Sequence, residues 1–244
     1  MEKKILMTKT GKKFFVKNLE EDFHTQYGYV AAAVLKKAKA GSKILTNTGV
    51  ELFVAEPQFI DIYQKIARGP QIIAPKDIGA IIAETGIGKK SVVVDAGGGS
   101  GALTFFLANI CKKVVTYEIR EDFFALLKKN KEFLGLKNVL VKNKSVYDGI
   151  DEKKVDVITL DLPEPWNAVA HAEKALVAGG FLISYSPSIP QIADFVAAVK
   201  KTEKLVILKV KEVIERKWEV EERKIRPFTQ MLGHTGFLVV CRKV

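Results

Sequence analysis

The sequence predicts a doubly wound α/β domain that follows a small β-rich module, and three observations predict it. From about residue 67 onward, short apolar runs alternate with helix-length amphipathic segments, which is the pattern of a parallel sheet covered by helices. The first 66 residues instead carry short strand-like runs separated by glycines. The composition, 48% hydrophobic and 27% charged over 244 residues, is that of a folded protein large enough for both parts. We therefore expect two domains, residues 1–66 and 67–244.

The expected strands of the N-terminal module are short. They cover Lys13–Lys17, Lys43–Thr46 and Val50–Val54, and glycines at positions 11, 28, 41 and 49 provide turns between them. No long amphipathic helix is expected in this module.

The second domain begins with a helix and then alternates. Asp77 is expected to cap a helix that carries Ile78, Ile81 and Ile82 and that Gly86 and Gly88 end. Five buried strands follow, at Val92–Asp95, Val114–Glu118, Val139–Val141, Val155–Asp161 and Phe181–Tyr185. The expected helices between and after them are Ala102–Ala108, Glu121–Leu134, Trp166–Leu176 and Ile189–Lys200.

The end of the chain breaks this alternation. Leu205–Glu222 has strand-like apolar positions, and Gly236–Cys241 follows with no helix-length pattern between them. We expect an antiparallel pair at the end of the sheet, and an antiparallel last strand is typical of class I methyltransferases among doubly wound folds.

The charge balance limits the kind of partner. Lys and Arg number 39 against 28 for Asp and Glu, a formal charge of +11, which favours a polyanionic partner over a neutral metabolite. A well-solvated lysine surface is the alternative interpretation.

The sequence has no run of about 20 apolar residues and no signal peptide, so we expect a cytoplasmic protein with no membrane partner. Neither the two cysteines nor the three histidines have metal-site spacing, and we expect no metal.

A glycine-rich loop follows the first strand of the second domain. It reads Gly97-Gly98-Gly99-Ser100-Gly101 and runs directly into a helix, so its backbone can turn sharply and approach a ligand closely. A nicotinamide dinucleotide would use Gly97, Gly99 and Ala102, whereas S-adenosylmethionine would lay its amino-acid portion along the whole loop. Glu118 ends the next strand, where a carboxylate can accept hydrogen bonds from two ribose hydroxyls in either case.

A second motif, Asp161-Leu162-Pro163-Glu164-Pro165-Trp166, ends the fourth strand. Ligands of open α/β sheets bind beyond the carboxyl ends of the strands, so Asp161 should face the same crevice as the glycine loop. The prolines restrict the loop. Trp166 is suited either to stacking on a base or to packing in the core.

Four stretches together resemble the tRNA adenine-N1 methyltransferases in their archaeal form. They are Arg68–Asp77, Asp95–Thr104, Asp161–Trp166 and Gly233–Leu238. The resemblance implies a Rossmann-like, S-adenosylmethionine-dependent catalytic domain behind a small β-barrel, assembled as a homotetramer that methylates N1 of adenine 58, and in archaeal relatives also adenine 57, of the tRNA T-loop. It implies Asp161 as the catalytic aspartate, and cofactor contacts at Gly97, Gly98, Gly99, Ser100, Gly101, Ala102, Leu103 and Glu118.

The chemistry gives Asp161 a role, because a carboxylate beside the exocyclic amine can orient adenine and accept a proton as positive charge develops.

Two positions depart from the family pattern. Ala74 stands where relatives carry a Tyr or His, and Ser145 stands where an acidic residue usually contacts the cofactor adenine. Ser145 and the backbone amide of Val146 remain candidates for that contact, with Asp148 as a substitute.

The basic residues Arg216, Lys217, Arg223, Lys224 and Arg226 near the terminal hairpin are the better candidates for RNA contacts. The lysine-rich runs 128–131 and 142–144 are expected to be solvated surface. Three other functions stay open at this point: methylation of adenine N6, a dinucleotide-dependent oxidoreductase with a parallel sixth strand, and a non-catalytic RNA-binding module.

Overall fold

The computed structural model describes residues 3–69 and 72–244. Pro70 and Gln71, which belong to the motif Arg68–Asp77, lie outside the described residues. The chain divides into two compact units, Met1–Lys65 and Ile66–Val244, so the division falls one residue before the boundary that we expected.

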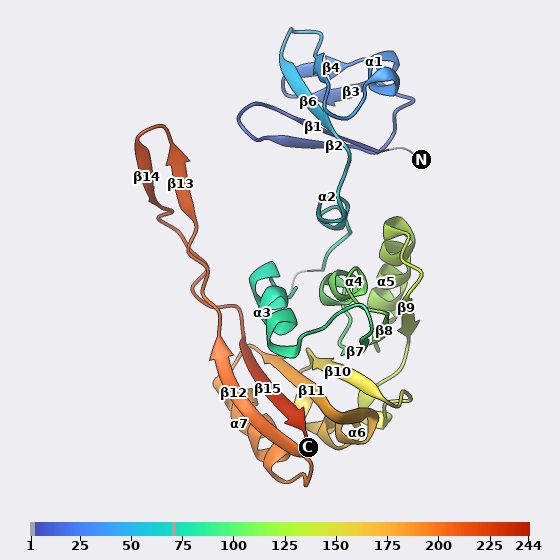
Figure 1. Cartoon of the computed structure of the whole chain (residues 1–244), viewed down its shortest axis with the longest axis vertical. Coiled ribbons are helices and arrows are strands. Elements are labelled where there is room, and N and C mark those ends of the chain that lie inside the picture. The colour runs from blue at the N-terminus through green and yellow to red at the C-terminus, as the bar shows by residue number, and fades with distance from the viewer. Residues whose placement is uncertain (1–2, 70–71) are drawn as a thin grey trace. The chain divides into compact units, whose positions relative to one another are not determined.

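The N-terminal unit is built on antiparallel strands (Figure 1). The sheet has the order β2–β1–β6–β5, and a separate hairpin and two short helices complete the unit. The bounds are β1 (Lys4–Met7), β2 (Lys13–Val16), β3 (Phe23–Thr25), β4 (Gly28–Val30), α1 (Ala32–Lys37), β5 (Lys43–Leu45), β6 (Glu51–Ala55) and α2 (Phe59–Tyr63).

The strand pairing differs from that of a closed barrel. Within residues 3–69, β2 and β5 are the edges of the four-stranded sheet, and the hairpin β3–β4 pairs only with itself. The hairpin is linked to the sheet through Asn47, whose amide donates to the Tyr29 carbonyl and whose side chain accepts from the Tyr29 amide. The side chains of Leu6, Val16 and Leu52 are fully buried between these pieces.

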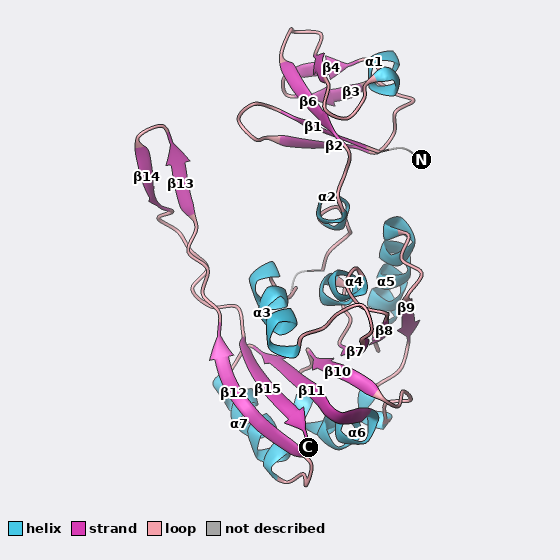
Figure 2. Ribbon diagram, viewed as in Figure 1, coloured by secondary structure: helices cyan, strands magenta, loops and turns pink. Residues whose placement is uncertain are grey.

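The second unit is a seven-stranded sheet covered by helices on both faces. Helices α3, α4 and α5 cover one face, and α6 and α7 cover the other (Figure 2). The bounds are α3 (Pro75–Thr85), β7 (Val92–Ala96), α4 (Ala102–Ala108), β8 (Lys113–Tyr117), α5 (Glu121–Leu134), β9 (Val139–Lys142), η1 (Val146–Asp148), β10 (Val155–Leu160), η2 (Pro165–Ala168), α6 (Val169–Ala175), β11 (Leu176–Ser186), α7 (Ile189–Lys200), β12 (Leu205–Glu212), β13 (Trp218–Glu221), β14 (Lys224–Pro227) and β15 (Phe237–Lys243).

The sheet order is β12–β15–β11–β10–β7–β8–β9. Strand β15 lies antiparallel between β11 and β12, whereas β7 to β11 pair in parallel. The expected antiparallel last strand is therefore present. The arrangement also places the carboxyl ends of β7, β8 and β10 at the same end of the sheet, where the glycine loop and the Asp161 motif begin.

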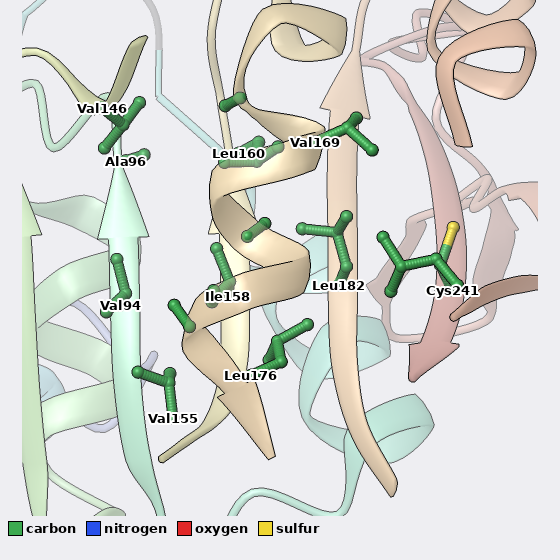
Figure 3. Close-up of a cluster of buried hydrophobic side chains, with 14 of the residues drawn as sticks. Val94, Ala96, Val146, Val155, Ile158, Leu160, Val169, Leu176, Leu182 and Cys241 are labelled. Carbon is green, nitrogen blue, oxygen red and sulfur yellow. The ribbon is translucent and has the colours of Figure 1, made fainter. Parts of the chain in front are cut away.

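The core of this unit is apolar and continuous. Figure 3 shows Val94, Ile158 and Leu182 on adjacent strands, with Val169 of α6 packed over them. These side chains are at most 2% exposed. Burial on this scale is the main stabilising contribution to the fold, at roughly 25 cal/mol per Å² of apolar surface.

Several element boundaries differ from the sequence-based expectation. Strand β11 begins at Leu176 instead of Phe181. Asp77 does not cap its helix: α3 begins at Pro75 after Ala74, and the Asp77 side chain is fully buried inside the first turn. The helix expected at Trp166–Leu176 is a short 3-10 segment, η2, followed by α6. The strand expected at Leu205–Glu222 is two strands in different sheets, β12 and β13.

The division of the expected last strand into β12 and β13 creates an extended segment of the chain. Residues 213–236, which we call the arm, leave β12, form the separate hairpin β13–β14 and return to β15 (Figure 1). The arm exposes large apolar side chains, including Trp218 at 55%, Val220 at 71% and Leu232 at 68%. In the described part of the chain, no helix is long and apolar enough to cross a membrane.

Candidate cofactor and acceptor site

A narrow cleft lies at the carboxyl ends of β7 and β10. Its lining contains residues of the glycine loop and the start of α4, together with Asp161. Three further lining residues, Ile72, Ile73 and Asp95, were not among the predicted site residues. The full lining is Ile72, Ile73, Asp95, Gly97, Gly98, Gly99, Ser100, Ala102, Leu103 and Asp161. The Asp161 amide donates to the Ala96 carbonyl at 2.9 Å, which fixes the second motif against the first. The two motifs that the sequence placed in one crevice therefore meet there.

The contact between these motifs requires glycine. A Cβ atom on Gly97 would lie 2.0 Å from the Asp161 carbonyl oxygen, and one on Gly98 would lie 2.3 Å from Thr116 Oγ1. Gly97 also has φ +85°, which side chains disfavour. The glycines thus allow a close backbone approach that brings Asp161 to the loop.

Ser100 lies inside the loop with an unused polar group. It is 3% exposed, and its Oγ atom has no hydrogen-bond partner among the described residues. Its carbonyl accepts from Asn130 Nδ2 at 2.9 Å. Asn130 is buried on α5, although solvated surface was expected for the run 128–131. A buried hydroxyl without a partner is costly in a folded protein, so a ligand atom at this position would complete its hydrogen bonding.

Glu118 follows β8 and faces the loop. Its Oε2 accepts from the Gly99 amide at 2.8 Å, and its Oε1 accepts from the Arg120 amide at 2.9 Å. The side chain of Asn143 donates to the Glu118 carbonyl at 2.8 Å. Each carboxylate oxygen retains a free lone pair, which is what two vicinal hydroxyls need.

The cleft concentrates negative charge. Asp95 is buried and accepts from Thr104 and Thr159 at 2.5 and 2.8 Å; burial, together with the charge of Glu118, raises its pKa above the ordinary value. Burial, followed by the charges of Asp95 and Glu118, raises the pKa of Asp161 to about 7. Two carboxyl groups in the cleft lining and Glu118 beside the loop are suited to a cationic ligand, whose charge would stabilise their ionised forms.

The loop that carries Asp161 is held from two sides. Tyr147 Oη accepts from the Glu164 amide at 3.2 Å, and Gln191 Nε2 donates to the Pro163 carbonyl at 2.9 Å. Trp166 does not line the cleft; it lines a groove with residues of α6 and α7. A role in stacking on a base at the cleft is therefore not supported for Trp166.

The predicted adenine contacts follow β9, two strands away from β7 in the sheet, and lie outside the cleft lining. The Ser145 hydroxyl accepts from the Tyr147 amide at 3.1 Å and caps η1, while the Val146 side chain is buried in the core. Their contact with a cofactor stays a prediction. Asp148 is exposed on η1.

The remaining candidates have structural partners. His234 bridges Glu212 and the Pro187 carbonyl, and Lys142 pairs with Asp151 and Glu152. Among residues 3–69 and 72–244, no group of three or more His, Cys, Asp or Glu side chains is arranged to hold a metal ion. The basic residues 216–226 lie on the arm and not in the cleft lining.

Comparison with known proteins identifies the family. Residues 63–227 match the family model described as the tRNA methyltransferase complex GCD14 subunit. The tRNA (adenine(57)-N(1)/adenine(58)-N(1))-methyltransferase TrmI of Methanocaldococcus jannaschii is 38% identical, over 98% of this chain and 94% of the relative. A tRNA (adenine(58)-N(1))-methyltransferase TrmI of Thermus thermophilus is 33% identical, over 91% of this chain and 88% of the relative.

Solved structures agree on the fold. The tRNA (m1A58) methyltransferase TrmI of Aquifex aeolicus superposes with a TM-score of 0.83 at 26% identity, covering 100% of this chain and 97% of that one. A protein of Thermotoga maritima described as a SAM-dependent O-methyltransferase gives 0.88 at 28% identity, covering 100% and 93%. The family model and the two curated relatives together show that the chain belongs to the GCD14/TrmI family of tRNA (adenine-N1)-methyltransferases.

Proposed function

We propose that this chain transfers a methyl group from S-adenosylmethionine to N1 of adenine in the tRNA T-loop, at position 58 and also at position 57. The observation that carries the proposal is the meeting of Asp161 with the glycine loop in one acidic cleft. Family membership supports the choice of RNA as substrate, and the two positions follow the name of the Methanocaldococcus relative.

The residues present fit the cofactor. The unpartnered Ser100 hydroxyl is placed to donate to a carboxylate at the loop, and Glu118 offers two oxygens to ribose hydroxyls. Gly97 through Leu103 would enclose the amino-acid end, and Ser145 and Val146 would lie toward the adenine. When bound, S-adenosylmethionine supplies an electrophilic methyl group on a cationic sulfur, and the negative charges of Asp95, Glu118 and Asp161 favour that cation.

Asp161 has the role of orienting the acceptor. In its ionised form, the carboxylate accepts a hydrogen bond from the exocyclic N6 amine and thereby aims N1 at the methyl donor. As N1 acquires a positive charge during attack, the same carboxylate stabilises that charge and takes the N6 proton. The base must first leave its pairing or stacking in the RNA, since N1 lies on the Watson–Crick edge.

Incubation of the protein with labelled cofactor and an unmodified tRNA transcript tests this function. We expect 1-methyladenosine on nucleoside analysis, with reverse-transcription stops at positions 57 and 58. Product at N6 would contradict the assignment of the acceptor atom. Cofactor binding with no transfer to RNA would favour a non-catalytic RNA-binding module, and transfer to a small hydroxylated acceptor alone would favour the O-methyltransferase function named for the Thermotoga neighbour.

We also propose that the protein works as a homotetramer in the cytoplasm. The exposed apolar side chains of the arm support assembly, because large apolar side chains gathered on one exposed segment are suited to burial in an interface. Light scattering should give four times the chain mass of 27.1 kDa. Trp218→Asp together with Val220→Asp should lower that mass; a monomeric wild-type protein would contradict the proposal.

A further inference from the structure

A closed polar network lies between the start of α3 and the two ends of the arm, with Asp77 buried and Lys76 and Thr235 partly exposed. The Asp77 carboxylate is fully buried; its Oδ1 lies 2.9 Å from Lys76 Nζ, and its Oδ2 accepts from Thr235 Oγ1 at 2.8 Å. Lys76 Nζ donates to Thr235 Oγ1 at 2.6 Å, which closes the ring, and to the Val213 carbonyl at 2.5 Å. None of these residues lines the cleft, and the proposed chemistry does not use them.

Stability alone does not account for this network. Removing a carboxylate and an ammonium from water costs several kcal/mol per ion, and apolar side chains of similar size often give equal or greater stability in such a position. A buried ion pair does, however, fix one geometry, because its partners cannot separate without leaving an unpaired charge. The groups that this network holds are therefore the guide to its role.

The first of these groups is Tyr185. Its hydroxyl lies 3.4 Å from Asp77 Oδ2, and its ring covers Gly236, where a Cβ atom would lie 2.5 Å from the ring carbon Cζ. The register of β10 and β11 pairs Leu160 with Ser184, so Asp161 and Tyr185 are the next residues along two adjacent parallel strands. Tyr185 thus lies on the strand next to the one that Asp161 follows.

The titration of Tyr185 agrees with this placement. Burial, followed by the charges of Asp77 and Asp161, raises the pKa of Tyr185 to about 12. The hydroxyl therefore stays protonated near neutral pH and donates its proton to the Asp77 carboxylate.

The second group is the arm itself. Val213 is its first residue and Thr235 its last but one, so Lys76 holds both of its ends. Arg216 and Arg223, on the arm, are exposed and have no ion-pair partner in the described part of the chain. Lys76 and Asp77 follow Ile72 and Ile73, which line the cleft. The same network therefore adjoins the cleft, Tyr185 and the base of the arm.

We propose that Lys76, Asp77 and Thr235 are positioning residues for the RNA acceptor: they fix Tyr185 beside Asp161 and hold the arm in register with the cleft. The inference rests on the proposed methyltransferase function and adds to it the residues that align the acceptor. It predicts that loss of the network impairs use of tRNA and leaves cofactor binding intact.

Thr235→Val tests the proposal, because valine keeps the shape of the side chain and removes both hydrogen bonds. We expect kcat/KM for tRNA to fall about 10- to 100-fold, the range that a small misplacement of reacting groups can cause. The Kd for S-adenosylmethionine, measured by calorimetry, should stay within about twofold, and Thr235→Ser should restore most of the activity. Asp77→Asn, which leaves Lys76 unpaired, should reproduce the loss.

Thr85→Val is the matched control, since Thr85 donates to the Ile81 carbonyl at 2.7 Å at the other end of the same helix. It should behave as wild type. Folded Thr235→Val and Asp77→Asn variants with wild-type kcat/KM for tRNA would overturn the proposal. Equal loss of cofactor affinity and melting temperature, without rescue by serine, would also overturn it in favour of a structural role. Failure of the wild-type protein to methylate tRNA in the same assay would instead refute the proposed function.

Discussion

At the residue scale, the chemistry of the cleft depends on three carboxyl groups that crowd one another. Asp95 and Glu118 are 2% and 7% exposed and are satisfied by hydrogen bonds within the fold. Asp161 is half-buried, and its side chain has no hydrogen-bond partner among the described residues. Of the three, Asp161 is the one available to an acceptor.

Asp161→Asn should lower kcat about 10²- to 10⁴-fold, the usual contribution of a positioned acid–base group. Asparagine keeps the shape but cannot take the N6 proton or stabilise the charge at N1. The Kd for S-adenosylmethionine should change by only a few-fold, because the glycine loop and Glu118, which would hold the cofactor, are unchanged. Single-turnover methyl transfer and calorimetry measure the two quantities. Activity near that of wild type would remove Asp161 from the mechanism.

The raised pKa of Asp161 also predicts a pH-dependent stability. The folded protein holds the proton up to about pH 7, whereas an unfolded aspartate releases it near its ordinary value of 3.8. Stability therefore falls as the pH rises from about 4 to 7, by up to about 4 kcal/mol for this group alone. Asp95 acts in the same direction.

Because asparagine does not titrate, Asp161→Asn should be more stable than wild type at pH 8 and similar to it at pH 4. Denaturant unfolding at both pH values measures this difference. A difference in stability that does not depend on pH would contradict the shifted pKa.

At the element scale, the close approach of two loops defines the site. Gly97→Ala would place a Cβ atom 2.0 Å from the Asp161 carbonyl, and backbone cannot move aside as a flexible side chain can. We expect the loops to separate and affinity for S-adenosylmethionine to fall more than about tenfold, since misplacement of this size is costly.

Gly86→Ala is the matched control for this variant. Gly86 has a positive φ of 64° like Gly97, but a Cβ atom there would meet nothing within 4 Å. It should cost about 1 kcal/mol of stability and leave cofactor affinity unchanged. Equal effects of the two substitutions on cofactor binding would show that the backbone conformation, and not the contact with Asp161, is what matters.

At the scale of the whole molecule, the excess of positive charge predicts salt-dependent RNA binding. Arg216 and Arg223 of the arm are the exposed candidates without an ion-pair partner in the described structure. Arg216→Gln with Arg223→Gln should weaken tRNA binding and reduce the slope of log K against log salt by about one to two units.

Arg226→Gln serves as the comparison for the arm, since the Arg226 Nε lies 3.1 Å from Glu219 Oε2 and the charge is already paired. It should change the slope less than the double variant does. An unchanged slope in the double variant would show that the arm does not contact phosphates.

The sequence by itself determined the alternation of strands and helices, the two loops of the cleft and the place of Asp161. These features depend on local periodicity, on glycine in tight turns and on the rule that parallel strands present their carboxyl ends together. The limits of α4, α5 and α7 agree with those expected; α5 and α7 have an apolar period, and α4 begins directly after Gly101.

Only the tertiary structure decided the features that depend on residues far apart in the chain. Asp77 looks like a helix cap in sequence, but it is buried against Thr235, 158 residues away. The strand expected at Leu205–Glu222 divides because β12 finds a partner in β15, whereas β13 finds one in β14. Strand register brings Tyr185 next to the strand that Asp161 follows. A local pattern fixes the direction of a side chain on its own element, but the partner that it meets is selected by packing of the whole unit.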